Sequence, residues 1–341
     1  MKHLKRRSKG KHGARNAITI VLIAAIATLL IYLSASGGAS TCSERAWNAS
    51  VQEYPAYVLF GPGCKIYLSN FGTGSVSVLY PSNGLVESAV TAGLGPDGIA
   101  LSPDGSYLYV ANYGSNSIAI LSTSKGIVTG TITGIRTPAG IAVSRNGSYI
   151  YATDNQGNSL YVISAASRDL VANISVGLDP SGIAVSRNGS YIYVAENDQN
   201  AIAEISAKNY TITNSAPAGI GPVNIVLSPD GRLIYISDNL GNTVSVLNSS
   251  SLSTLRTISV APAPVGLALS PGGSYLYVSS HVNGTVSMIS TSNYTILKTI
   301  SVGSLPIGIA VSPDGKYIYA ADYGSSELTS NPIAAGNSRG T

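Results

Sequence analysis

The residues best suited to chemistry recur at one position of the sequence, at intervals of 42 residues. Four of them are acids, and the remainder are amides or a serine. Because Ca²⁺ takes carboxylate and amide oxygens as ligands, a ring of such residues is a candidate cation site. The structural alternative is that Asn and Asp bond to nearby backbone and cap turns. The residues at this position are Asn70, Asn112, Asp154, Glu196, Asp238, Ser280 and Asp322.

Three other residues break the local pattern. Asn224 stands where most equivalent positions carry Gly, Glu204 places a charge in an apolar stretch, and His281 is the only histidine beyond residue 12. A nucleophilic relay would depend on His281 alone, and neither a Gly-X-Ser-X-Gly elbow nor a His-X-X-X-His pair occurs. The pattern therefore favours binding over catalysis, with Asn224 and His281 added to the binding candidates.

All of these residues belong to a repeat of about 42 residues. One tyrosine recurs every 42 residues from Tyr67 to Tyr319, which gives seven copies. In each copy Pro-X-Gly leads into an apolar run, a tight turn of the Ser-Pro-Asp-Gly kind follows, and three further strand-like segments complete the unit. In one copy these strands are expected at 99–101, 107–110, 117–121 and 127–133. Four strands per copy predict an all-β, seven-bladed β-propeller of four-stranded antiparallel blades.

The repeat resembles the YVTN-type β-propeller proteins through Ser-Pro-Asp-Gly-X-Tyr-X-Tyr-Val-Ala-Asn at 102–112 and its variants in later copies. The resemblance covers about 290 residues and implies a cell-surface or surface-layer-associated protein. More distantly, the chain looks like the propellers of lactonases and quinoprotein dehydrogenase subunits. A metal-dependent lactonase would need Glu, Asn and Asp side chains to converge, and Glu196, Asn224 and Asp322 are the available candidates. Calcium is then the cation to expect, and the sequence implies no other cofactor.

The last copy is incomplete. Its third strand begins at Glu327, residues 330–332 are expected to stop it, and no fourth strand follows. Residues 46–51 precede the first copy at the offset of a fourth strand, so we expect them to complete the seventh blade. With this closure, the N-terminal segment would leave the propeller on the face that carries the turns between the first and second strands and between the third and fourth strands. The loops between blades would then face away from it.

The N-terminal segment has the composition of a membrane-targeting sequence. Residues 1–16 carry seven basic residues and no acid, and residues 17–33 carry no charge. As a helix this apolar stretch is about 25 Å long, close to what a bilayer requires. Positive flanks stay in the cytoplasm, so the repeats are expected outside the cell. The alternatives are a signal peptide cleaved near residues 34–36 and, more weakly, a pilin-type signal cut near Gly13.

We therefore expect a basic cytoplasmic tail at 1–16, a transmembrane signal-anchor at 17–35, a linker at 36–45, a propeller at 46–330 and a C-terminal tail at 331–341. Without the first 16 residues the net charge changes from +4 to −3, because 13 basic residues remain against 16 acids. This distribution argues against a nucleic-acid partner.

An extracellular location gives meaning to two further features. Cys42 and Cys64 are expected on the same face, and an oxidising compartment would favour a disulfide between them over two free thiols. Eight Asn-X-Ser/Thr sequons become candidate glycosylation sites, although a chain rich in Asn, Ser and Thr also forms them by chance. They are Asn48, Asn146, Asn173, Asn188, Asn209, Asn248, Asn283 and Asn293.

Three functions remain open after this reading. The favoured one is a membrane-tethered extracellular propeller that binds a protein or glycan partner through its outward face. The others are a structural surface-layer component and a metal-dependent lactonase. Fold alone does not choose between them.

Overall fold

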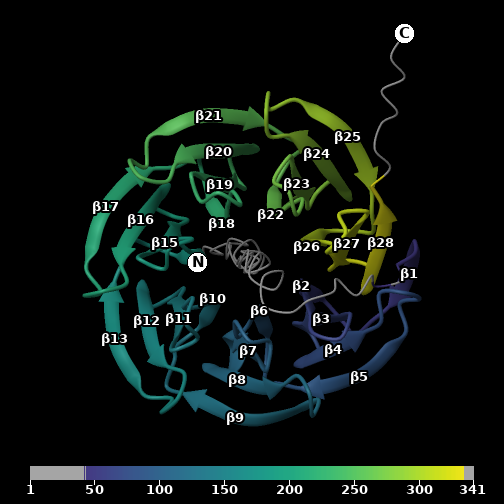
Figure 1. Ribbon diagram of the computed structural model, residues 1–341, viewed down its shortest axis with the longest axis horizontal. Coiled ribbons are helices and arrows are strands. Elements are labelled where there is room, and N and C mark those ends of the chain that lie inside the picture. The colour runs from purple at the N-terminus through teal and green to yellow at the C-terminus, as the bar shows by residue number, and fades with distance from the viewer. Residues whose placement is uncertain (1–41, 43, 334–341) are drawn as a thin grey trace, which may run out of the picture.

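The computed structural model describes residue 42 and residues 44–333, and they form a closed ring of seven four-stranded antiparallel sheets (Figure 1). The predicted all-β, seven-bladed propeller is confirmed. The innermost strands contact one another around the centre, and each blade proceeds outward through its second, third and fourth strands. We number the blades from 1 to 7 in the order of these innermost strands.

The innermost strand of each blade begins at the repeated proline, so in blade 2 it starts at Pro96, three residues before the predicted start at residue 99. Blade 1 comprises β2 (Pro55–Gly61), β3 (Lys65–Asn70), β4 (Ser75–Leu79) and β5 (Val86–Thr91). Blade 2 comprises β6 (Pro96–Leu101), β7 (Tyr107–Asn112), β8 (Ser117–Ser122) and β9 (Ile127–Thr133), with a short 3₁₀ turn, η1 (Tyr113–Ser115), after β7. Blade 3 comprises β10 (Pro138–Val143), β11 (Tyr149–Asp154), β12 (Ser159–Ser164) and β13 (Leu170–Ser175).

The next three blades repeat the same plan. Blade 4 comprises β14 (Pro180–Val185), β15 (Tyr191–Glu196), β16 (Ala201–Ser206) and β17 (Ile212–Pro217). Blade 5 comprises β18 (Pro222–Leu227), β19 (Leu233–Asp238), β20 (Thr243–Asn248) and β21 (Thr254–Ser259). Blade 6 comprises β22 (Pro264–Leu269), β23 (Tyr275–Ser280), β24 (Thr285–Ser290) and β25 (Ile296–Ser301).

Blade 7 is assembled from both ends of the described chain. It comprises β26 (Pro306–Val311), β27 (Tyr317–Asp322), β28 (Glu327–Pro332) and β1 (Trp47–Ser50). β1 pairs antiparallel with β28, with Trp47 opposite Ser330, which confirms the predicted closure. The expected early stop of the third strand is wrong, because β28 continues to Pro332. The missing N–H of Pro332 costs no bond to β1, since the β1 ladder reaches only Ser330.

The hydrophobic core lies between neighbouring blades. The repeated tyrosine of the second strand is buried in every blade, and six of the seven copies are at most 2% exposed. Each core cluster joins residues of two blades. At the closure, for example, Phe60 of blade 1 packs edge-on against Tyr319 of blade 7 at 4.9 Å between ring centroids. The repeat is therefore stable only as a ring, because each blade covers its neighbour.

Hydroxyl groups add a polar contact between the innermost strands of some blades. Ser279 of β23 accepts a hydrogen bond from the N–H of Gly266 in its own blade and donates one to the carbonyl of Ile307 in the next, at 2.7 and 2.8 Å. Ser69, Thr153 and Ser237 make the same pair of contacts in blades 1, 3 and 5. Ala111, Ala195 and Ala321 occupy this position in blades 2, 4 and 7.

The propeller has two distinct faces. The turn face carries the two turns within each blade, such as residues 102–106 and 123–126 of blade 2. The loop face carries the remaining connections, such as 113–116 within blade 2 and 134–137 leading to blade 3. Both ends of the described chain lie on the turn face, because β1 begins there and Ile333 bonds to the carbonyl of Lys316. The loop face is therefore opposite both ends.

The N-terminal segment is attached to the turn face by a disulfide. Cys42 is bonded to Cys64, in the short turn between β2 and β3, with the Cα atoms 5.6 Å apart. Glu44 lies within hydrogen-bond distance of the Tyr319 hydroxyl, so the end of the expected linker packs on blade 7. No helix among the described residues is long and apolar enough to cross a membrane. The anchor predicted at 17–35 lies outside them.

The sequons are distributed unevenly over the described ring. Four lie in turns of the turn face, three lie on strands, and Asn283 lies in a connection of the loop face. Those in turns are Asn146, Asn188, Asn209 and Asn293, and those on strands are Asn48 in β1, Asn173 in β13 and Asn248, which ends β20 at the turn face. Asn146 has a structural role as well, because its Oδ1 accepts bonds from the Ser144 hydroxyl and the Ser148 N–H.

Candidate functional site

The seven residues that end the second strands are buried inside their own blades. Asp238 illustrates the arrangement, since its carboxylate accepts hydrogen bonds from Gly219 N–H, the Thr243 hydroxyl and the Ser245 hydroxyl at 3.1, 2.9 and 2.8 Å. These donors belong to the third strand and to the loop that enters the same blade. All seven residues are at most 3% exposed: Asn70, Asn112, Asp154, Glu196, Asp238, Ser280 and Asp322. Hydrogen bonds within their own blades fasten six of these side chains, all except Asp322, which favours the structural interpretation for those six.

The three candidates for a lactonase centre, Glu196, Asn224 and Asp322, belong to three different blades. Glu196 accepts a bond from Gly177 N–H at 2.7 Å within blade 4, whereas Asp322 belongs to blade 7 on another part of the ring. Asn224 lies on β18 of blade 5 with its N–H bonded to Ser237. Within the described part of the chain, no three His, Cys, Asp or Glu side chains cluster closely enough to hold a metal ion.

The charge of Glu204 is also satisfied locally. Its carboxylate accepts a hydrogen bond from the Thr213 hydroxyl at 2.7 Å, across the strand pair β16–β17. The residue is 7% exposed and faces the interior of blade 4. Glu204 therefore belongs to the packing of its blade.

A second set of residues lies one position further along the chain and surrounds the centre of the loop face, which we call the mouth. They follow the second strand directly and contact the start of the innermost strand in the next blade. Asn197 donates to the carbonyl of Pro222 at 3.1 Å, and Asn239 donates to the carbonyl of Pro264 at 3.2 Å. We call this set the mouth ring, which consists of Phe71, Tyr113, Asn155, Asn197, Asn239, His281 and Tyr323.

His281 is the member of the mouth ring that the sequence had singled out. Its side chain is 5% exposed, and neither ring nitrogen completes a hydrogen bond. Burial lowers the pKa of the imidazole, although the nearby carbonyls of Pro306 and Leu305 oppose this effect. Burial therefore favours the neutral form of the His281 imidazole.

Three consecutive members of the mouth ring are aromatic. Tyr323 of blade 7 stacks on Tyr54, with ring centroids 4.8 Å apart, and the Phe71 ring of blade 1 lies against Gly95. Tyr113 of blade 2 completes this aromatic arc. A Cβ atom at residue 95 would come within 3.3 Å of the Phe71 ring, so glycine permits this close approach.

A buried carboxyl group lies near the aromatic arc. Asp97 is on the innermost strand β6, is 3% exposed, and leaves its Oδ2 without a hydrogen-bond partner. Burial raises the pKa of Asp97 well above its usual range. Burial also raises the pKa of Tyr113 and of Tyr323, and the proximity of Asp97 adds to both shifts. These two residues flank the acid from blades 2 and 7.

The next section of the mouth ring is a polar network. The Tyr113 hydroxyl lies 3.5 Å from Asn155 Oδ1 and 3.1 Å from Gln156 Nε2, and the Asn155 amide donates to Asp179. Burial raises the pKa of Asp179 to about 6, and the nearby Asp198 adds to the rise. The mouth therefore presents an aromatic half and a polar, partly acidic half.

The loop face also exposes large aliphatic side chains. Leu240 and Ile220 are neighbours, because Gly241 N–H bonds to the carbonyl of Ile220 and Leu240 packs near Gly221. Exposed aliphatic side chains in a group mark interaction surfaces more often than single ones do. The five on this face are Leu94, Leu178, Ile220, Leu240 and Val282, and each is between 48% and 68% exposed.

The strand-end positions that the sequence singled out lie one residue before the mouth ring in each blade. The strand-end position was a candidate because its acids and amides recur. They recur because these side chains make similar hydrogen bonds within their own blades. The mouth ring differs in chemistry from blade to blade, with aromatics in blades 7, 1 and 2 and amides in blades 3, 4 and 5. The variation in residue type at this repeat position was the feature of the sequence that could have indicated the mouth ring.

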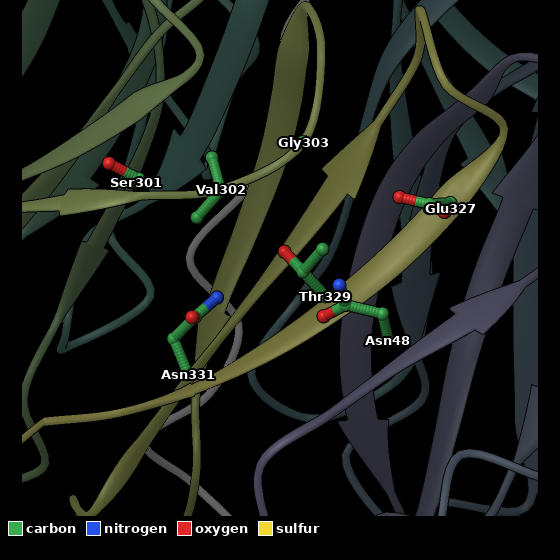
Figure 2. Close-up of a pocket in the computed structure, with 7 residues that line it drawn as sticks. All are labelled: Asn48, Ser301, Val302, Gly303, Glu327, Thr329 and Asn331. Carbon is green, nitrogen blue, oxygen red and sulfur yellow. The ribbon is translucent and has the colours of Figure 1, made fainter.

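A separate pocket of about 220 Å³ lies between blades 6 and 7 (Figure 2). Asn48 of β1 and Asn331 and Thr329 of β28 form one wall, and Glu327 lies at the start of the same strand. The end of β25 and the connection after it form the other wall. Ser301 is the last residue of β25, and Val302 and Gly303 follow it.

Two family models match separate parts of the chain. Residues 68–231 match a model described as a choice-of-anchor I domain, and residues 248–341 match one described as a lactonase, 7-bladed beta-propeller. Each match covers less than half of the chain. The anchor-domain match and the disulfide together indicate an extracellular, surface-anchored protein. No curated protein matches the sequence.

Solved structures share the fold at low sequence identity. Hydrazine synthase of Kuenenia stuttgartiensis matches with a TM-score of 0.75 and 19% identity, over 89% of this chain and 99% of that one. A streptogramin B lyase structure matches with a TM-score of 0.73 and 18% identity, over 84% of this chain and 97% of that one. At such identities the likeness establishes the seven-bladed architecture alone.

Proposed function

We propose that this chain is a membrane-anchored, extracellular propeller of the YVTN type that binds a protein partner through its loop face. The binding surface is centred on the mouth ring and includes the exposed aliphatic residues around it. The observation that carries the proposal is the chemistry of the mouth ring. Its side chains comprise aromatic rings, amides and one imidazole, whereas the core position of the second strand is a tyrosine in every blade.

The orientation of the propeller supports this choice of face. The basic tail and apolar stretch at residues 1–33 have the composition of a membrane anchor, and the described chain begins on the turn face. The loop face then points away from the membrane, where a partner has free access. Seven of the eight sequons are outside this face, so glycans would leave most of it open.

The side chains favour a protein over a glycan as the partner. Aromatic rings and amides serve both classes of ligand, but exposed Leu, Ile and Val side chains bury best against apolar groups of another protein. A Leu at the centre of such a contact would contribute about 1.5–3 kcal/mol through burial. Acidic residues Asp179 and Asp198 at the same face would select a partner with basic residues at the rim.

Binding to the cells that produce this protein tests the proposal. The fluorescently labelled full chain is expected to bind saturably, and Leu240→Glu is expected to weaken binding at least tenfold. Leu85→Glu is the matched control, because Leu85 is 63% exposed but lies on the turn face. Treatment of the cells with a protease should remove binding. Loss after glycosidase treatment alone would identify a glycan ligand, and equal binding by both variants would contradict the proposed face.

A further inference from the structure

We infer that the pocket between blades 6 and 7 is a binding site for Ca²⁺ that holds the closing strand β1 in the ring. The pocket is distinct from the mouth ring, and it is bordered by the strand pair that closes the propeller (Figure 2). One of its residues, Glu327, brings a carboxylate to a position that carries none in any other blade, as a comparison with blade 5 shows.

In blade 5 the fastening carboxylate has a complete set of donors. Asp238 is bonded by Gly219 N–H and by the hydroxyls of Thr243 and Ser245. The residues at these positions in blade 7 are Asp322, Gly303, Glu327 and Thr329. A hydroxyl donor has thus been replaced by a second carboxylate. Blade 7 is alone in this respect, since the position of Glu327 carries Ser, Thr or Ala in the other six blades.

The replacement leaves buried oxygen atoms without partners. Asp322 is 0% exposed, and neither of its carboxylate oxygens completes a hydrogen bond, although the Gly303 N–H and the Thr329 hydroxyl are its neighbours. The Thr329 hydroxyl is also buried and completes no hydrogen bond. Unpartnered buried carboxylates are costly, and a bound cation would relieve that cost.

The pocket lies beside the buried Asp322 carboxyl group. Gly303, Glu327 and Thr329 line it, and all three adjoin the Asp322 carboxyl group. A Cβ atom at residue 303 would lie 2.6 Å from Asp322 Cγ, so any side chain there would intrude on the carboxyl group. The other side chains with polar atoms are those of Asn48, Ser301 and Asn331. The donor set is therefore entirely oxygen, and it combines two carboxylates with neutral hydroxyl and amide groups.

This chemistry selects calcium among the divalent cations. Ca²⁺ accepts six to eight oxygen ligands in flexible geometry, whereas Mg²⁺ requires a regular octahedron. Extracellular modules bind Ca²⁺ with dissociation constants of about 10⁻⁴–10⁻³ M, which suits a site that is partly open to solvent. Because Asn48 comes from β1 and Glu327 and Thr329 come from β28, the ion would bridge the two strands that close the ring.

The test uses the full chain, purified in detergent from a host without N-glycosylation, because a glycan on Asn48 would occupy the pocket. At 10 mM Ca²⁺ and a dissociation constant near 1 mM, the ratio of folded to unfolded chain should rise about tenfold. Thermal unfolding with Ca²⁺ or EDTA measures this shift. Terbium luminescence measures binding directly, with excitation of Trp47, the only tryptophan of the chain and the neighbour of Asn48.

Glu327→Gln should abolish the calcium-dependent shift and reduce terbium luminescence at least tenfold. Asp322→Asn should have the same effect, and Glu327→Gln keeps the test valid if Asp322→Asn does not fold. Asp238→Asn is the matched control in blade 5 and should retain the full response to calcium. A wild-type chain that gains neither stability nor luminescence would overturn the inference, as would a Glu327→Gln variant that keeps both.

Discussion

Tyr113 and Asn155 occupy the same position in consecutive blades, 42 residues apart, and the Tyr113 hydroxyl lies 3.5 Å from Asn155 Oδ1 across the blade boundary. This contact shows how one repeat position produces a continuous surface. Each member of the mouth ring reaches towards the next blade, so a change of side chain in one blade alters the surface shared by two. A ring of near-identical units can thereby present a single, asymmetric binding site.

The first prediction concerns the hydroxyl contacts between innermost strands. Ser279→Ala should lower the free energy of unfolding by about 1–3 kcal/mol, because a buried N–H and a buried carbonyl both lose their partner. Ala195→Ser in blade 4 is the reverse substitution at an equivalent position. Denaturant unfolding of both variants measures the effect. Equal stability of Ser279→Ala and the wild type would show that these hydroxyls contribute nothing to ring stability.

The second prediction concerns the closure of the ring. Cys42→Ser combined with Cys64→Ser should lower the free energy of unfolding by about 3 kcal/mol, because the disulfide closes a segment separated by 22 residues. A reducing agent should produce the same loss in the wild type and none in the double variant. A wild-type melting temperature that is unchanged by reduction would mean that β1 is held by β28 and its packing alone.

These features of closure were only partly accessible from the sequence. The offset of residues 46–51 predicted the fourth strand of blade 7, because strand spacing within a repeat is fixed by the ladder. The predicted end of β28 was wrong. A proline usually ends a strand, but Pro332 lies beyond the part of β28 that pairs with β1, where its missing N–H is not needed. Cys42 and Cys64 could be placed on one face, but their distance depends on how the segment before β1 packs against blade 7.

The third prediction concerns pH in the absence of calcium. Burial raises the pKa of Asp322 from 3.8 to about 7 and that of Asp238 to about 6. The folded chain therefore binds more protons than the unfolded chain between about pH 4 and pH 7, and the free energy of unfolding falls as the pH rises through this range. Melting temperatures measured from pH 4.5 to 8 in EDTA should show this decline.

Asp322→Asn should make the decline shallower, particularly between pH 6 and 7, because it removes the group with the higher of these two pKa values. The control is Asp314→Asn, since Asp314 lies in an accessible turn and its pKa is lowered by its contacts with Lys316 and Ser312 despite partial burial. A melting temperature that rises steadily from pH 4.5 to 8 would contradict the direction assigned to the buried acids.

The candidate site shows a different limit of sequence analysis. The strand-end acids were recognised as polar and periodic, but the sequence could not show that their own blades supply their hydrogen bonds. Likewise, Asp97 follows the repeated proline at a position whose residue type differs between copies. Only the fold shows that it lies near Tyr113 and Tyr323. Side-chain direction at the end of a strand depends on the bulge and loop that follow, which the repeat pattern does not encode.

The most direct test of the account is photo-crosslinking from the two faces of blade 2. Benzoylphenylalanine would replace Tyr113 in the mouth ring or Tyr107 at the other end of β7, one position at a time, in the full chain on the cells that produce it. Tyr107 is 42% exposed on the turn face, so a crosslinker at position 107 is also accessible to a neighbouring protein. The account predicts a discrete protein adduct from position 113 and none from position 107. Adducts from position 107 alone, or equally from both, would contradict binding through the loop face.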